Sequence, residues 1–458
     1  MNQMVDRYFN DLAGKSIAVL GIGVSNRPLI RLLLSYGLQV TACDRTPRDQ
    51  LDAEVLELEA AGAVLKVGPA YLEGLSADIV FRTPGMHPNI PALCMLRDGG
   101  AVITSEMEAF FAVCPCPIIA VTGSDGKTTT TTLIAEMLKQ SGKNVWIGGN
   151  IGNPLLPAAA EMKKTDIAVV ELSSFQLMNM KQSPSVAVVT NLAPNHLDVH
   201  KDMDEYIQAK ENIYLHQSKS DRIVLNLDNE ITAGFSSKAV GEVSFFSRLQ
   251  EPKNGVWFHE NIIWRGNTPV LNRSDILIPG LHNVENYMAA ICAVEGLVSD
   301  EDIRIVARTF GGVEHRIELV REFQGVRYYN DSIASSPTRT IAGLHAFDQK
   351  VILIAGGYDK QLPFDVLGPE IVRHVKALIL CGATADKIKK AVMEAPGYHE
   401  GNPIIVTADR LSDAVEAAKE IAIPGDVVTL SPACAAFDQF KNFMVRGAVF
   451  KDLVRSLK

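Results

Sequence analysis

Short apolar runs alternate with helix-like stretches along much of the chain. Residues 16–20, 39–44 and 78–81 read as strands, and residues 29–36 have the apolar spacing of a helix. Strands that alternate with helices in this way form βαβ units, whose strands lie parallel. The first hundred or so residues therefore predict an α/β domain with a parallel sheet.

The same alternation returns in two later segments. After a helix that begins near Ser105, strands are predicted at 166–171 and 186–190, then short apolar runs with Gly and Asn turns over 221–279, and a helix over 280–298. A third segment from Val313 has predicted strands at 351–354, 378–380, 404–406 and 427–430. At 458 residues the chain is too long for one core, so about two to four domains are expected.

The segment 118–131 is the most informative in chemical terms. A buried apolar strand runs into a Gly turn, then Lys127, then threonines that open a helix. The N–H groups of such a loop and helix N-terminus bind phosphate, Lys127 can reach the outer phosphates, and the Thr128 hydroxyl can hold Mg²⁺. Val121 stands where the usual G-x-x-x-x-G-K-[ST] motif has its first Gly, and an ordinary strand–turn–helix is the alternative. The Gly-Lys-Thr combination at this junction favours nucleotide binding, which predicts use of ATP.

Composition narrows the class of partner. A net charge of −9 argues against a nucleic-acid partner, and the 47% hydrophobic and 21% charged content is that of a globular protein. No apolar run reaches membrane-spanning length, and residues 1–14 lack a signal-peptide core. The seven cysteines are scattered, and Cys114-Pro-Cys116 is more typical of a loop with reduced thiols than of a metal site. A cytoplasmic location is predicted.

A second possible nucleotide turn lies near the N-terminus. Gly21-x-Gly23 resembles a dinucleotide-binding turn, but Asn26 occupies the place of the third Gly, and Asp44 ends the following strand. The pair of glycines fits a diphosphate site and an ordinary turn equally well.

Two further residues suggest metal chemistry. Glu171 ends a buried strand downstream of the phosphate loop, so it is placed to hold Mg²⁺ or to cap a helix. Lys210 continues the apolar stripe of residues 203, 207 and 214, which predicts an inward-facing amine. Such an amine can stay neutral and form a carbamate with CO₂, which is an oxygen ligand; the alternative is a lysine whose head reaches solvent.

Histidines and C-terminal loops complete the set. His196, Asp198 and His200 lack the spacing of a zinc site, so a single histidine that assists a Mg²⁺ site or a reacting group is favoured. Residues 330–337, 356–360 and 431–440 each follow a strand, where α/β proteins carry either ligand-binding loops or plain turns.

Taken together, these segments resemble the Mur ligase family. The matching pieces run in family order: 122–128, 149–152, 171–176, 191–198, 206–210, 280–283 with Asn286, 315–316 and 330–332. Within that family, residues 431–443 resemble the member that adds D-glutamate, and the Asp-Asn-Pro-Arg signature of the diaminopimelate- or lysine-adding member is absent.

The resemblance implies an α/β fold of three domains. These are a Rossmann-like UDP-substrate domain (1–105), a central P-loop-type ATPase domain (106–312) and a Rossmann-like C-terminal amino-acid domain (313–458). It also implies a reaction of peptidoglycan precursor synthesis in which ATP phosphorylates the carboxylate of UDP-N-acetylmuramoyl-L-alanine. The D-glutamate amine then attacks the acyl phosphate. A monomer that needs ATP and Mg²⁺ is expected.

The resemblance further implies a role for each matching residue. Catalysis is expected from Lys127, Glu171, His196 and Lys210, with metal ligands Thr128, Glu171, His196 and carbamylated Lys210. ATP is expected to contact Gly123, Gly126, Lys127, Thr128, Thr129, Asn283, Asn286, Arg316 and Asp331. The UDP substrate is expected to contact Ser25, Asp44, Arg45, Gly85, Asn150, Ser173 and His196. D-Glutamate is expected to contact Ser335, Lys360, Ala436, Phe437 and Phe443.

Some positions depart from the family pattern, and other functions compete. Asp125 replaces a frequent Asn, Ile333 a Lys, and Ser335 and Ala436 a Thr and a Ser, so the D-glutamate pocket differs most.

An NAD-dependent oxidoreductase would explain Gly21-x-Gly23 and Asp44 but not the 118–131 loop. A related ligase for another amino acid, such as a folate polyglutamylating enzyme, is disfavoured by residues 431–443, and a pure binding module by the many ordered candidate groups.

Overall fold

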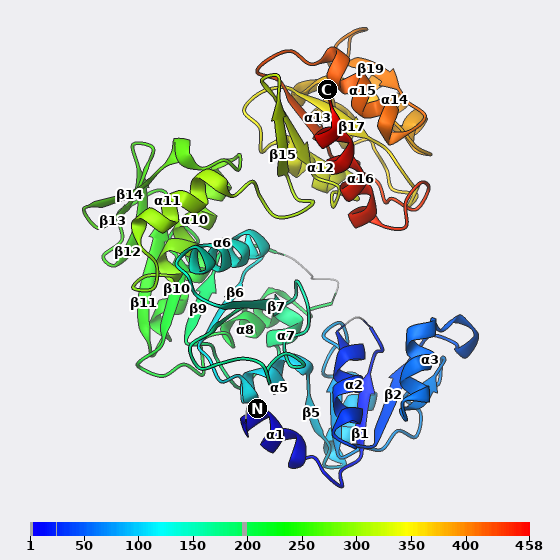
Figure 1. Cartoon of the computed structure of the whole chain (residues 1–458), viewed down its shortest axis with the longest axis vertical. Coiled ribbons are helices and arrows are strands. Elements are labelled where there is room, and N and C mark those ends of the chain that lie inside the picture. Colours follow the sequence, from blue (N-terminus) through cyan, green and yellow to red (C-terminus); the bar gives the residue numbers. More distant parts are fainter. Residues whose placement is uncertain (1–2, 24, 195–198) are drawn as a thin grey trace. The chain divides into compact units, whose positions relative to one another are not determined.

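The computed structural model describes residues 3–23, 25–194 and 199–458. The chain forms two compact units, one of residues 1–272 with 285–306 and one of residues 273–284 with 307–458. Three separate sheets, each flanked by helices, run through it in chain order (Figure 1). The predicted α/β class is thereby confirmed.

The first sheet is fully parallel. Its order is β3-β2-β1-β4-β5, from β1 (Ile17–Leu20), β2 (Val40–Asp44), β3 (Val64–Val67), β4 (Ile79–Arg82) and β5 (Val102–Thr104). Every residue of β1 and β4 is buried, as central strands covered on both faces require. The accompanying helices are α1 (Gln3–Asn10), α2 (Asn26–Ser35), α3 (Ala53–Ala60) and α4 (Pro91–Asp98). The three strands predicted in this segment are confirmed, and β3 and β5 are additional.

The second sheet carries the phosphate loop. Its order is β14-β13-β12-β11-β10-β9-β6-β8-β7, from β6 (Ile118–Thr122), β7 (Val145–Gly149), β8 (Ile167–Glu171), β9 (Val186–Val189), β10 (Arg222–Asn226), β11 (Glu242–Ser247), β12 (Gly255–His259), β13 (Ile262–Arg265) and β14 (Thr268–Asn272). The strands from β7 to β12 pair in parallel, and β12, β13 and β14 form an antiparallel meander. The short runs of 221–279 are therefore five strands.

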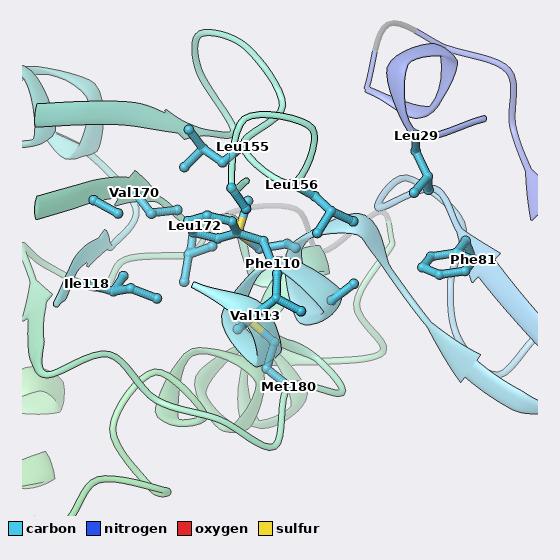
Figure 2. Packing of buried hydrophobic residues seen from close by; sticks show 14 of the residues in the cluster. Leu29, Phe81, Phe110, Val113, Ile118, Leu155, Leu156, Val170, Leu172 and Met180 are labelled. Carbon is cyan, nitrogen blue, oxygen red and sulfur yellow. The ribbon is translucent and has the colours of Figure 1, made fainter. Parts of the chain in front are cut away.

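Helices and an apolar core surround this sheet. They are α5 (Glu106–Val113), α6 (Lys127–Gln140), α7 (Ser174–Leu177), α8 (Met203–Glu211), α9 (Glu230–Gly234), α10 (Leu281–Ala293) and α11 (Asp300–Thr309), so the helix predicted over 280–298 ends five residues early. Figure 2 shows Phe110 of α5 among Leu155, Leu156 and Leu172. This packing fixes the strands, and with them the loops at their carboxyl ends.

Glu106, the first residue of α5, is a buried acid in this core. Its Oε1 accepts a hydrogen bond from the N–H of Leu156 at 2.8 Å. Burial raises the pKa of this carboxyl from 4.5 to about 7, although N–H donors act in the opposite direction. The folded protein therefore holds the proton more tightly than the unfolded chain does. The stability that protonated Glu106 contributes is complete below pH 4.5 and is lost as the pH rises through about 7.

We expect Glu106→Gln to reduce this pH dependence. Gln stays neutral and keeps an acceptor for Leu156, so its melting temperature should fall less than that of the wild type between about pH 5 and about pH 8. The difference should correspond to roughly 3 kcal/mol, since one pKa unit is worth about 1.4 kcal/mol. Thermal melts at both pH values measure it, and the exposed Glu161→Gln should follow the wild type. Parallel curves for Glu106→Gln and wild type would contradict the assignment.

The third sheet has the order β15-β16-β20-β17-β18-β19. It contains β15 (Glu318–Phe323), β16 (Val326–Asn330), β17 (Val351–Ala355), β18 (Val375–Leu380), β19 (Ile404–Thr407) and β20 (Val427–Leu430). Only β15 is antiparallel to its neighbour. The helices are α12 (Pro337–Leu344), α13 (Leu367–His374), α14 (Ala385–Met393), α15 (Leu411–Ile421) and α16 (Phe443–Ser456). All four strands predicted here are confirmed.

Other expectations have more limited support. Each sheet falls inside one of the segments 1–105, 106–312 and 313–458, and these domain boundaries stay predictions. All seven cysteines are free thiols. In the part of the chain that the structure describes, no helix has both the length and the apolar character needed to span a bilayer.

Candidate functional site

The loops after four neighbouring strands meet at one edge of the central sheet. β9, β6, β8 and β7 are adjacent, and at their carboxyl ends lie Asn191, the 123–126 loop, Glu171 and Asn150. Glu171 pairs with Val121 of β6 in register. In parallel α/β sheets this edge is where ligands bind. The position of Val121 explains why it is not Gly. This residue still belongs to the buried strand β6, whereas the usual motif has a Gly at this place in a longer loop.

The phosphate loop ends at Gly126, which precedes α6. Gly126 has φ of +77°, and a Cβ there would clash with Oδ1 of Asn286. No side chain among the described residues caps this helix at its N-cap. The first N–H groups of this 14-residue helix face the loop, and the helix dipole favours negative charge there.

Lys127 bends back over this loop. Its Nζ donates to the carbonyl oxygens of Gly123 at 2.9 Å and Ser124 at 2.8 Å. The ammonium thus lies against the concave backbone on which a phosphate would rest. Its contact with the outer phosphates stays a prediction.

Glu171 joins Thr128 and Asn150. Its Oε2 accepts from the Thr128 hydroxyl at 2.8 Å, and its Oε1 accepts from Nδ2 of Asn150 at 2.9 Å. Glu171 is 1% exposed. A buried carboxylate beside a threonine hydroxyl supplies the hard oxygen donors that Mg²⁺ prefers. These residues fit such an ion, and the role of Glu171 as a helix-capping acid is not needed, since Ser173 caps α7.

Lys210 lies on α8 and faces inward, as the apolar stripe predicts. It is 2% exposed, and its Nζ donates to the Thr122 hydroxyl at 3.0 Å and to the Gly123 carbonyl at 2.9 Å. Burial, and next the nearby charge of Lys127, lower the pKa of this amine well below its usual value, while Glu171 acts in the opposite direction. A lysine head that reaches solvent is therefore excluded, and the lowered pKa favours the neutral amine, which is the form that reacts with CO₂.

Several polar side chains at this edge of the sheet make contacts that the sequence did not predict. The Asn191 Oδ1 accepts from the Asp125 N–H at 2.9 Å, and the Tyr206 and Ser124 hydroxyls lie 3.0 Å apart. Asn286, predicted to contact ATP, accepts a hydrogen bond from the Thr130 hydroxyl at 3.2 Å. These groups hold the loop shape. Polar residues directly after strands were the available signal.

His196 and Asp198 lie outside the described residues. His200 is buried, with its Nε2 2.9 Å from the Ser174 hydroxyl and its ring stacked on Phe175. His200 therefore has the surroundings of a structural histidine.

The N-terminal turn has its own geometry. Gly21 has φ of +86°, and a Cβ there would lie 2.9 Å from Cγ2 of Thr83. Asn26, which replaces the third Gly, donates from Nδ2 to the carbonyls of Leu20 and Gly21 at 3.2 and 2.8 Å. Its side chain therefore ties the turn. Of the residues predicted to contact the UDP substrate, Ser25, Arg45 and Gly85 are exposed.

Asp44 fixes the same turn from the neighbouring strand. Its Oδ2 accepts from the N–H of Ile22 at 2.8 Å, and its Oδ1 accepts from the Thr46 N–H and hydroxyl. Burial tends to raise the pKa of Asp44, but these hydrogen bonds prevail and lower it. The acid stays ionised and shapes the loop.

In the C-terminal unit, the loops after β16, β20 and β17 are neighbours. Asp331 donates its N–H to the Leu430 carbonyl at 2.8 Å, Gly356 to that of Pro432 at 2.9 Å, and Tyr358 to that of Ala435 at 2.9 Å. The Asp331 carboxyl is buried and accepts from the Ser431 hydroxyl at 2.8 Å, and burial raises its pKa to about 7. Arg316, by contrast, is exposed, and the Asn283 Nδ2 donates to the Pro279 carbonyl at 2.6 Å.

A buried arginine that the sequence reasoning missed holds these loops. Arg446 of α16 is 3% exposed and donates to the Ser332 carbonyl and hydroxyl and to the carbonyls of Cys434 and Ala435, at 2.9 to 3.1 Å. Burial lowers its pKa to about 10, so it stays charged. Its place on an apolar helical stripe, between Phe443 and Phe450, is the signal that could have found it, as it did for Lys210.

The predicted D-glutamate residues lie around these loops. Ala436 is buried, Ser335 and Phe443 are partly exposed, and Lys360 and Phe437 are exposed. The Phe437 ring lies edge-on to Tyr358, with centroids 5.8 Å apart. The structure thus brings these residues to loops at one edge of the third sheet, and their role stays a prediction.

The three sheets and the phosphate loop indicate a multidomain α/β protein of the nucleotide-binding class, and comparisons with known proteins make the class specific. Residues 121–294 match the Mur ligase middle domain, and residues 315–434 the Mur ligase glutamate ligase domain. The chain belongs to the Mur ligase family.

Individual relatives agree with this assignment. Over the full length of both chains, it is 51% identical to UDP-N-acetylmuramoylalanine–D-glutamate ligase of Acetivibrio thermocellus and 50% identical to the protein of that name from Clostridium acetobutylicum. A solved structure of UDP-N-acetylmuramate–alanine ligase from Thermotoga maritima has the same fold, with a TM-score of 0.58 at 18% identity over 97% of this chain and 100% of that one. Membership in a ligase family removes the oxidoreductase alternative.

Proposed function

We propose that this chain joins D-glutamate to UDP-N-acetylmuramoyl-L-alanine at the expense of ATP, as a step of peptidoglycan precursor synthesis in the cytoplasm. The observation that carries the proposal is the meeting of Lys127, Thr128 and Glu171 at the ends of adjacent strands. The names of full-length relatives at about half identity supply the substrates. A monomer stays a prediction.

Phosphoryl transfer from ATP to the substrate carboxylate needs positioned positive charge more than covalent help. Lys127 supplies one such charge once its ammonium leaves the carbonyls of Gly123 and Ser124 for the phosphates. The N–H groups at the start of α6 hold the phosphate chain. Asn191 fixes the loop and Asn286 fixes α6 just after it, so the backbone N–H donors need little rearrangement during the reaction.

Thr128 and Glu171 would hold one Mg²⁺, and Glu171, a carbamate on Lys210 and the predicted ligand His196 would hold a second. When bound, such an ion neutralises phosphate charge. The support for the carbamate is that Lys210 is buried, has a lowered pKa and lies beside the same loop.

In the second half of the reaction, the D-glutamate amine attacks the acyl-phosphate carbonyl, a C–N bond forms, and inorganic phosphate leaves with the C–O electron pair. The proposed amino-acid site lies at the loops that Arg446 ties together, near Ser335, Lys360 and Phe443. The proposed UDP site lies in residues 1–105, at the Gly21 turn with Ser25, Arg45 and Gly85. Asn150 and Ser173 would contact the muramoyl-alanine portion.

The amino-acid dependence of phosphate release tests the function. With ATP, Mg²⁺ and UDP-N-acetylmuramoyl-L-alanine present, D-glutamate should trigger release, whereas L-glutamate, L-lysine and diaminopimelate should not. A stronger response to another amino acid would overturn the substrate assignment and leave the family unchanged.

We expect Gly21→Ala to weaken the binding of the UDP substrate and to leave ATP binding nearly unchanged. The added methyl group meets Thr83 in a backbone conformation with φ of +86° that alanine disfavours. The KM for UDP-N-acetylmuramoyl-L-alanine should rise by about tenfold or more, since about 1.4 kcal/mol of strain corresponds to tenfold. The KM for ATP should change little. Gly234→Ala, where a Cβ meets open space, is the control. An unchanged KM for the UDP substrate would place its binding elsewhere.

A further inference from the structure

Two histidines and a glutamate gather on the surface of the C-terminal unit, among loops and helices that the proposed reaction does not use. His345 directly follows α12, and Glu370 and His374 belong to α13. One potential ligand atom from each lies within 4.8 Å of the others. The Glu370 Oε2 is 2.7 Å from Nε2 of His345 and 3.5 Å from Nε2 of His374.

The helix geometry makes this arrangement a stable feature. Glu370 and His374 are four residues apart, so they share one face of α13. Leu367 and Ile371, each three residues before one of this pair, lie on the adjacent stripe of the helix and are fully buried, which anchors α13. The side chains of His345, Glu370 and His374 are 52%, 17% and 32% exposed. The carboxylate therefore forms the floor of a group whose imidazoles are open to solvent.

We propose that His345, Glu370 and His374 bind a zinc-type transition-metal cation that links α12 to α13. Two imidazole nitrogens and one carboxylate oxygen form a frequent three-ligand set for Zn²⁺, with water in the fourth position. Mg²⁺ prefers oxygen ligands and would not be held here.

The end of α13 also suits a cation. His374 is the last residue of this helix, where the helix dipole favours positive charge.

Two basic side chains oppose the cation. Arg373 donates to Oε1 of Glu370 at 2.7 Å, and Lys350 donates to the Val372 carbonyl at 3.1 Å. A metal ion bound to Oε2 of Glu370 would replace the hydrogen bond of 2.7 Å between this oxygen and Nε2 of His345. The charge of Arg373 and Lys350 lowers the affinity of the cluster for any cation. Removal of the Arg373 charge should therefore strengthen zinc binding.

Calorimetric titration of the untagged, chelator-treated full chain with zinc sulfate tests the site. The wild-type protein should bind one zinc ion. His374→Ala and Glu370→Gln should each lower the zinc affinity by at least about tenfold, because even changes in the groups around metal ligands typically have an effect of this size. Arg373→Gln should bind more tightly. His399→Gln alters an exposed histidine of the same unit and should titrate like the wild type. A Glu171→Gln background keeps this zinc ion, because it changes only the proposed Mg²⁺ site.

A spectroscopic readout covers the case in which a variant folds poorly. Co²⁺ bound to wild type should give the visible absorption of a tetrahedral site, and His345→Gln should lose it while retaining the wild-type circular dichroism. The proposal is overturned if wild type takes up no zinc, or if the affinities of wild type, His374→Ala and Glu370→Gln are equal. Since this cluster is separate from the phosphate loop, failure here would leave the proposed ligase function intact.

Discussion

Replacing Lys127 by alanine is expected to lower ATP-dependent phosphate release by about 10²–10³-fold, the loss typical when one donor to a charged transition state is removed. The ammonium lies against the Gly123 and Ser124 carbonyls of the phosphate loop, and no other lysine is hydrogen-bonded to both of these carbonyls in the described part of the chain. The lost charge cannot be replaced by a neutral methyl group. A coupled phosphate-release assay with D-glutamate and UDP-N-acetylmuramoyl-L-alanine measures the effect.

The control lies on the same helix. Lys139 of α6 is exposed and pairs with Glu136 at 2.7 Å on the surface, so Lys139→Ala should keep wild-type turnover. Both variants should melt at nearly the wild-type temperature, because neither lysine is part of the apolar core. Near-normal turnover of Lys127→Ala with an unchanged KM for ATP would contradict the assignment of this loop.

Lys210→Ala is expected to be nearly inactive, and acetate or formate should partly restore it. The buried amine of Lys210 has a lowered pKa and lies against the phosphate loop, so a carbamate there would offer an oxygen ligand beside Glu171. Loss of a metal ligand should cost roughly 10²-fold in activity. A short carboxylate can enter the vacated space and supply the oxygen, and Lys210→Glu should retain part of the activity for the same reason.

The rescue is measured at fixed Mg²⁺ over a series of acetate and formate concentrations. Lys210→Met, which keeps most of the buried volume, should fold but stay inactive without carboxylate. Lys127→Ala should gain nothing from acetate, since it lacks a cation and not an oxygen. If Lys210→Ala still binds ATP and no carboxylate revives it, Lys210 acts as a simple charge or as a packing residue.

Much of the fold could be predicted because the apolar pattern is local. The strands β1 and β17 are continuous apolar runs, and β8 and β20 each contain one polar residue. Their positions and their parallel pairing follow from the alternation with helices. The meander of β12, β13 and β14 was less visible, because each of these strands has at most two fully buried residues.

The candidate site divides in the same way. The Gly-Lys-Thr loop and the strand-ending Glu171 are visible in the sequence, since motif and strand end are local features. Arg446 was missed, although it binds Ser332, Cys434 and Ala435, because its four acceptors come from two other loops. The His345, Glu370 and His374 cluster was missed for the same reason, since α12 and α13 are separated in sequence by β17.

The sequence by itself determined the α/β class, the phosphate loop and the inward face of Lys210, because spacing along one strand or helix decides each of them. Only the tertiary structure decided which strand ends are neighbours. It brought Asn150, Glu171 and Thr128 together and gave Asn26 the carbonyls of its turn. It also shifted the pKa values of Glu106, Lys210 and Asp331. The physical reason is that burial and hydrogen bonding depend on residues far apart in the chain, which meet only when the sheets assemble.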